Sequence, residues 1–186
     1  MAQIHAIFPT LISIENLEEF KSEHQKMYKK ILEWKEKYPS KRKWNCYTTI
    51  GHELESKDSL FQRLIQVCTE KVQNFAKEID VSKNITLYSI WSNINGPGHS
   101  QEFHTHPESV FSAVYYIKVN EDSGNVQFLK PSEMFGKCTL GNLKTRQLYQ
   151  PHEGDFVIFT SDTPHRVLLN RSNEDRVSLA MNFNIK

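Results

Sequence analysis

The sequence predicts a mainly β protein in which two N-terminal helices pack on one outer face of an antiparallel barrel or jelly roll. Apolar residues repeat at helical spacing in the first half of the chain, and the period changes to two from about residue 84. About eight short segments with this period then follow, separated by turns rich in glycine, proline and aspartate. Short strands that come after helices are typical of a closed β structure with helices outside it.

The length of 186 residues predicts a single domain over residues 1–186, with helical support at about 14–80 and a β core at about 84–185. Lys and Arg total 23 and Asp and Glu total 22, so no strong field attracts nucleic acid or a membrane surface. The three cysteines lack metal-ligand spacing, which is typical of reduced thiols. With no signal segment and no long apolar run, we expect a soluble cytoplasmic protein.

Two amphipathic helices are predicted in the first half of the chain. The first has apolar residues at steps of three and four over residues 17–34, and Pro39 lies beyond its end. The second has a stronger apolar stripe over residues 60–79, with Asp58 or Ser59 available as N-cap. Both stripes are expected to pack against a sheet, because a helix that lies on a sheet needs one apolar face.

The predicted strands are residues 85–94, 102–106, 110–119, 126–129, 147–149, 156–160, 166–169 and 176–185. In the last strand, Val177, Leu179, Met181, Phe183 and Ile185 alternate with Arg176, Ser178, Ala180, Asn182 and Asn184. We expect the apolar row to pack against the helices and the polar row to line a cavity inside the barrel. A buried arginine needs an anionic partner, which is either a ligand or a carboxylate of the protein itself at the rim.

Histidines indicate a metal site in the second half of the chain. His104 and His106 are two residues apart on a predicted strand, so their imidazoles share one face. A third imidazole from another strand, such as His165, would complete the site. Three protein ligands on one side leave the other side open, as in catalytic metal sites. Asp162 and Thr163 are candidates for the hydrogen bond that orients His165.

A series of segments in the second half resembles the iron(II)- and 2-oxoglutarate-dependent oxygenases. The segments are 104–109, 112–117, 124–128, 154–159, His165 and 176–178. The chain looks most like the branch related to prolyl hydroxylases that occurs in bacteria and phages. This resemblance implies a double-stranded β-helix (jelly roll, cupin-like), with Fe(II), 2-oxoglutarate as co-substrate and O2. It also implies hydroxylation of a substrate that the sequence does not identify, with release of succinate and CO2.

The resemblance assigns His104 and His165 to the first and the distal histidine ligands of the family. His106 stands where the family pattern has Asp or Glu, so this ligand brings no negative charge to the metal. Strand parity favours His106 as the second ligand. Glu102, which has the same parity, Glu108, which follows Pro107, or a water molecule are the alternatives.

Arg176 lies eleven residues after His165 and matches the basic residue with which such oxygenases bind the distal carboxylate of 2-oxoglutarate. Ser178, on the same face, adds a hydroxyl donor. The further candidates for co-substrate contacts are Tyr116, Asn93 and Asn182, each with a hydrogen bond inside the barrel as the alternative. Tyr115 is expected to point outward into the packing.

Two other functions are compatible with the sequence. A cupin-type metal enzyme with three histidines would not use 2-oxoglutarate, but it would leave Arg176 and Ser178 without a role. A catalytically silent barrel that binds a carboxylate ligand or a protein partner would explain the missing acidic ligand. The oligomeric state is open, with a homodimer among the options.

Overall fold

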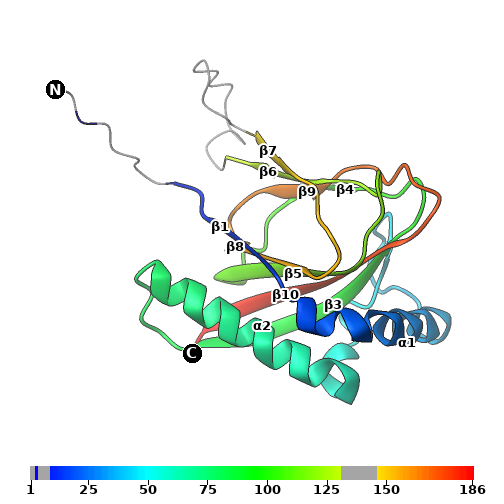
Figure 1. Ribbon diagram of the computed structural model, residues 1–186, viewed down its shortest axis with the longest axis horizontal. Coiled ribbons are helices and arrows are strands. Elements are labelled where there is room, and N and C mark those ends of the chain that lie inside the picture. The colour runs from blue at the N-terminus through cyan, green and yellow to red at the C-terminus, as the bar shows by residue number, and fades with distance from the viewer. Residues whose placement is uncertain (1–2, 4–8, 131–145) are drawn as a thin grey trace.

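The computed structural model describes residue 3 and residues 9–130 and 146–186 as two antiparallel β-sheets that face each other (Figure 1). The larger sheet contains, in spatial order, β1 (Ile12–Asn16), β8 (Asp155–Thr160), β5 (Phe111–Lys118), β10 (Arg176–Ile185), β3 (Ile85–Asn95) and β2 (Tyr47–Thr48). The smaller sheet contains β4 (Gln101–His104), β9 (His165–Val167), β6 (Val126–Leu129) and β7 (Arg146–Tyr149). The predicted mainly β class is confirmed.

Two α-helices, α1 (His24–Lys37) and α2 (Ser59–Glu78), cover the outer face of the larger sheet, as predicted (Figure 1). Short 3-10 helices, η1 (Glu18–Glu23) and η2 (Glu55–Lys57), precede them, so the first α-helix begins later than residue 17. Asp58 is the N-cap of α2, because its Oδ1 accepts a hydrogen bond of 3.0 Å from the backbone N–H of Leu60. Within the described residues, neither helix combines the length and the apolar character needed to cross a bilayer.

The alternation predicted for β10 is confirmed up to Phe183. It is wrong at the end of the strand, where Ile185 is 43% exposed and Asn184 does not line the cavity, after a register shift between Asn182 and Phe183. Val177, Leu179, Met181 and Phe183 belong to the main apolar core between the larger sheet and the helices. Arg176 and Ser178 are buried on the other side, where they line a cavity between the two sheets. In the register of the sheet, Arg176 lies opposite Asn95 of β3, and Ser178 lies between Asn93 of β3 and Tyr116 of β5. The strand therefore separates an apolar layer from a polar interior.

The edge strands β1 and β2 lie in the N-terminal half and were not among the predicted strands. β1 pairs with β8, and β2 contributes only Tyr47 and Thr48 beside β3. Both strands are short, and β1 is largely exposed, so neither has the apolar alternation that sequence reasoning requires. Their pairing depends on the docking of the chain against the finished sheet. The division of a single domain into helical and β parts stays a prediction.

Candidate metal centre and co-substrate pocket

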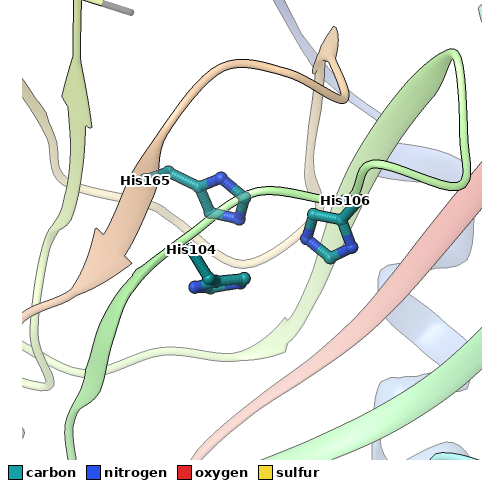
Figure 2. A group of neighbouring side chains, drawn as sticks. All are labelled: His104, His106 and His165. Carbon is teal, nitrogen blue, oxygen red and sulfur yellow. The ribbon is translucent and has the colours of Figure 1, made fainter. Parts of the chain in front are cut away.

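Three imidazoles meet in the space between the two sheets (Figure 2). His104 ends β4 and pairs in register with His165 at the start of β9, while His106 lies two residues beyond β4. One potential ligand atom of each ring lies within 4.8 Å of the corresponding atoms of the other two. The ring centroids are 4.3 Å apart for His104 and His165, and 5.1 and 5.2 Å from His106 to these two. The structure therefore brings together the three histidines that the sequence singled out.

His106 lies in a loop and not on the strand that was predicted to contain it. The strand was expected to continue to residue 106, but β4 ends at His104. A backbone hydrogen bond of 2.8 Å from the N–H of His106 to the carbonyl of Ser161 holds the segment that follows. The ring of His106 is nearly parallel to that of His165, at 7°, and its centroid is 5.9 Å from that of Trp91. Loop docking, rather than strand parity, places this imidazole.

A β-bulge changes which residues of β4 face the interior. Gln101 pairs with Val167 and His104 with His165, so β4 has one residue more than β9 between these pairs. Gln101 therefore lines the cavity together with His104, and the side chain of Glu102 is exposed. The expectation that Glu102 joins His104 beside the metal site is wrong for this reason, since Glu102 is not in the described lining of this cavity.

Glu108, the other acidic alternative, is also exposed. Among the described residues, the group of possible ligands around His104, His106 and His165 contains no carboxylate. The arrangement supports His106 rather than Glu102 or Glu108 as the second ligand.

Backbone carbonyls orient two of the three rings. Nδ1 of His104 donates to the carbonyl of Glu102 at 2.8 Å, and Nδ1 of His165 donates to the carbonyl of Thr163 at 3.0 Å. A carbonyl can only accept, so the proton sits on Nδ1 and the lone pair remains on Nε2. Metal-bound histidines usually have such a partner on the other ring nitrogen. The partner of His165 is thus the main chain of Thr163 and not the side chain of Asp162.

Burial keeps all three imidazoles neutral. It lowers the pKa of His104 below its ordinary value and that of His106 to about 4, with a smaller contribution from neighbouring His104 in the second case. The pKa of His165 falls well below the usual range, again mainly through burial. Neutral rings keep the lone pairs that a metal ion needs, so the site is prepared for a cation near neutral pH.

We expect the metal-free protein to lose stability as the pH falls from about 6.5 to about 4. Histidines in an unfolded chain have a pKa near 6.5, whereas that of His106 is about 4 in the fold. The unfolded state therefore binds more protons in this window, and the free energy of unfolding rises with pH. Urea unfolding at pH 7.5, 6 and 5 measures the effect. His106→Asn should flatten the slope, and an unchanged slope in this variant would contradict the assignment.

The inner cavity, between the two sheets, is lined by the three histidines and by all five residues predicted to bind the co-substrate. These are Arg176, Ser178, Tyr116, Asn93 and Asn182, and each is less than 10% exposed. Its described lining residues include no aspartate or glutamate. Tyr115, by contrast, points outward as predicted, and its hydroxyl lies 2.6 Å from Nε2 of His24 in the core.

Arg176 is 2% exposed and is held by neutral groups. Its Nη1 donates to the carbonyl of Gly124 at 2.9 Å, and Nη2 lies 3.5 Å from Oδ1 of Asn95. The ring centroid of Tyr116 is 5.7 Å from the guanidinium carbon. Among the described residues, no carboxylate forms an ion pair with Arg176, so the predicted alternative of a salt bridge within the protein is not found there. A buried guanidinium without an anion favours an anionic ligand.

Four buried polar atoms around the inner cavity have no hydrogen-bond partner among the described residues. They are Nε1 of Trp91, Oδ1 of Asn93, Nδ2 of Asn95 and Nε of Arg176. Three of these residues alternate along β3, which therefore presents a row of unpaired groups between the histidines and the guanidinium. Such atoms are costly unless a ligand or water pairs with them. Asn182 differs, because its Oδ1 accepts from Ser112 Oγ at 2.9 Å within the barrel.

Trp91, Asn95 and Gly124 were missed as site residues by the sequence analysis. The alternation of β3 was the available signal for the first two, since both are in phase with Asn93. Gly124 was identified as part of a turn and of a segment that carries the family resemblance, but nothing local indicates that its carbonyl holds Arg176.

We expect Gly124→Ala to destabilise the protein by at least about 2 kcal/mol, because Gly124 has a φ of +95° and a Cβ would lie 2.2 Å from the carbonyl oxygen of Leu168. The displaced loop would also move the carbonyl that holds Arg176. Gly98→Ala is the matched control, since Gly98 has a φ of +77° but a Cβ there meets nothing within 4 Å. Its cost should stay near about 1 kcal/mol. Equal losses in urea unfolding would rule out the steric explanation.

The fold is shared with several solved 2-oxoglutarate-dependent enzymes. The epimerase SnoN from nogalamycin biosynthesis superposes with a TM-score of 0.72 at 12% identity, over 95% of this chain and 79% of that one. A Pseudomonas putida prolyl-4-hydroxylase gives 0.66 at 13% identity, over 95% and 94%. HygX from Streptomyces hygroscopicus gives 0.68 at 11% identity, over 95% and 84%. At these identities the likeness concerns the fold, and it confirms the predicted jelly roll.

By sequence, no curated protein matches the chain. Residues 89–182, just over half of the chain, match the family described as "Putative 2OG-Fe(II) oxygenase". This match spans β3 to most of β10 and so includes every residue predicted for the site. The chain therefore belongs to the 2OG-Fe(II) oxygenases, as the resemblance of its motifs implied.

Proposed function

We propose that His104, His106 and His165 hold iron(II), that Arg176 binds the distal carboxylate of 2-oxoglutarate, and that the enzyme hydroxylates its substrate. The oxygenase class, with Fe(II), 2-oxoglutarate and O2, follows from the family. The observation that carries the residue assignment is the convergence of three neutral imidazoles within 4.8 Å in a cavity that also contains a buried guanidinium without an ion pair among the described residues.

The chemistry of the donors fits iron(II). Imidazole nitrogen is a suitable ligand for this ion, and an ion held by these three imidazoles would remain open on its other side to 2-oxoglutarate and O2. His104 and His165 present Nε2 in fixed orientations, because the backbone binds Nδ1 of each. A solved HygX contains nickel and 2-oxoglutarate, and a solved SnoN contains Fe3+ and α-ketoglutarate. We infer that the present cavity binds a metal ion and 2-oxoglutarate as well, because its own residues are suitable for both.

The donors at the deep end of the cavity fit a carboxylate. Within the described parts of the chain, Nε of Arg176 and Nδ2 of Asn95 have no partner, and the buried hydroxyl of Ser178 lies on the same face of β10 as Arg176. A guanidinium binds a carboxylate through two parallel hydrogen bonds, which fixes both the distance and the orientation of the bound acid. The residues of β3 and β10 thus orient the co-substrate along the cavity toward the histidines.

The other walls of the cavity exclude water. Val126 and Phe128 of the smaller sheet form an apolar cluster with Val157, Phe159 and Tyr116 of the larger sheet. Bound iron(II) supplies the activation of O2, which is coupled to the decarboxylation of 2-oxoglutarate to succinate and CO2. The protein orients the reacting groups and excludes water from them. An apolar wall also strengthens the polar contacts of Arg176, because the surrounding medium is less polar than water.

Succinate formation tests the proposal. The purified protein is incubated with Fe(II), ascorbate and 2-oxoglutarate, and succinate is measured with and without each component. We expect succinate only when iron and 2-oxoglutarate are both present, at the slow rate of turnover without primary substrate. Metal-dependent turnover that needs no 2-oxoglutarate would instead support a cupin-type enzyme, and failure to bind any divalent ion in calorimetry would support a silent barrel.

A further inference from the structure

A second hollow, the outer groove, is lined by two of the three histidines, His104 and His106. Its walls are residues 42–45, Tyr88 and Trp91 of β3, and residues 100–109. It meets the inner cavity at five residues that line both hollows: Trp91, Gln101, His104, His106 and Asn182. Arg176 lines the inner cavity but is not in the described lining of the outer groove, so a molecule in the groove would contact His104 and His106 without contacting Arg176. A primary substrate has to lie in this way if the proposed function is correct.

Charge in and around the inner cavity favours a negatively charged occupant of the outer groove. Three neutral imidazoles and Arg176 surround the centre, and the described lining of the inner cavity has no acidic side chain. Iron(II) and a guanidinium together outweigh the two negative charges of 2-oxoglutarate, so the loaded centre keeps an excess of positive charge. In a poorly solvated cavity this excess acts on nearby charges more strongly than it would in water.

One wall of the outer groove is positively charged, like the loaded metal centre. Arg42 and Lys43 are exposed, and among the described residues neither forms an ion pair. The acids of the groove, Glu102 and Glu108, belong to a different wall, formed by β4 and the loop after it. An anionic group is thus attracted to the segment that contains Arg42 and Lys43 and repelled from the segment that contains Glu102 and Glu108, which orients the ligand.

Aromatic side chains line the outer groove together with the cations and two of the histidines. Trp44 and Tyr88 line the outer groove, and Tyr88 is 57% exposed although it is a large side chain. Trp91 lies beside His106, and its buried Nε1 has no acceptor among the described residues. Aromatic faces bind flat rings by stacking or edge contacts, while the indole N–H can donate to an oxygen or nitrogen of the bound molecule.

We propose that the outer groove binds the primary substrate and that this substrate is an anionic compound with an aromatic or heteroaromatic ring. The anionic group lies toward Arg42 and Lys43, the ring contacts Trp44 and Tyr88, and an acceptor atom pairs with Nε1 of Trp91 near the iron site. This assignment rests on the proposed function only for the identity of the metal centre. The groove and its charges are properties of the chain itself.

Binding of simple aryl anions tests the proposal without knowledge of the natural substrate. The protein is loaded with Zn(II) and the unreactive analogue N-oxalylglycine, and is then titrated with phenyl phosphate, benzoate and neutral phenol. Two of the three tryptophans line the groove, so fluorescence quenching reports binding there, and calorimetry gives the affinity. We expect both anions to bind at least ~5-fold more tightly than phenol, and this preference to vanish in about 1 M salt, where charges are screened.

Variants separate the groove from the rest of the surface. The double variant Arg42→Gln, Lys43→Gln should weaken the binding of phenyl phosphate ~5-fold, and Tyr88→Ser should weaken it ~3- to 10-fold. Lys83→Gln is the matched control, because Lys83 is exposed and lies outside the lining of the groove. Equal binding of phenol, no binding of either anion, or an equal loss in the control would overturn the proposal. Failure of Zn(II) or N-oxalylglycine to bind would instead count against the proposed function.

Discussion

His165→Ala is expected to abolish iron-dependent turnover and to weaken metal binding by at least ~100-fold. Loss of a residue that only supports a metal ligand already costs about 10- to 100-fold in affinity, and His165 is proposed as a ligand itself. His165 is 6% exposed and its ring lies 4.3 Å from that of His104 between centroids, so the substitution removes a buried member of the group of three imidazoles. Calorimetric titration with Fe(II) under anaerobic conditions, or with Zn(II), measures the loss directly.

His152→Ala is the matched control for that experiment. The side chain of His152 is 74% exposed, its Nδ1 lies 3.3 Å from Oδ2 of Asp155, and His152 is outside the described lining of the inner cavity. The control should keep the affinity and the stoichiometry of the wild type. A His165→Ala protein that still binds one equivalent of metal with wild-type affinity would exclude the three-histidine centre, provided that its circular dichroism spectrum shows an intact fold.

Arg176→Gln is expected to weaken the binding of 2-oxoglutarate by about 100-fold while metal binding stays unchanged. The proposed contact is a two-point charge-assisted bond in a dry cavity, and removal of one partner of such a pair costs roughly 2–5 kcal/mol. Calorimetry with N-oxalylglycine on the Zn(II)-loaded protein gives the affinity, and the KM for 2-oxoglutarate in the succinate assay gives an independent value.

Two further variants sharpen the test at Arg176. Arg176→Lys retains the charge but loses the planar fork, so it should recover only part of the affinity. Arg171→Gln removes an exposed arginine outside the cavity and should have no effect. If Arg176→Gln bound N-oxalylglycine as tightly as the wild type, the distal carboxylate would have to lie elsewhere, and the proposed orientation of the co-substrate would be wrong.

Much of the fold was predictable because its signals are local. The apolar stripe of α2 and the alternation of β10 up to Phe183 follow from which residues have to leave water, and both are confirmed by the packing of the core. The inward orientation of Arg176 follows from the same alternation, since it is in phase with Ser178 and out of phase with Val177. The residues of the site on β10 could therefore be named without coordinates.

Other parts of the site depend on contacts between distant segments, which the local sequence does not indicate. The bulge between Gln101 and His104 keeps Glu102 out of the described lining of the inner cavity, and a bulge is decided by pairing with a distant strand. His106 joins the group because its backbone binds Ser161, more than fifty residues away in the chain. The role of Gly124 as the acceptor for Arg176 likewise becomes visible only when the two strands and their loops are in place.

The sequence by itself determined the family, the class of fold and the candidate residues, because hydrophobic period, residue type and motif order are properties of the chain. Only the tertiary structure decided how three imidazoles and one guanidinium share a single cavity, and that Glu102 and Glu108 stay outside it. The physical reason is that the geometry of the ligands depends on contacts between residues far apart in the sequence. Which of these residues pair is determined by the free energy of the complete folded structure and not by any local segment.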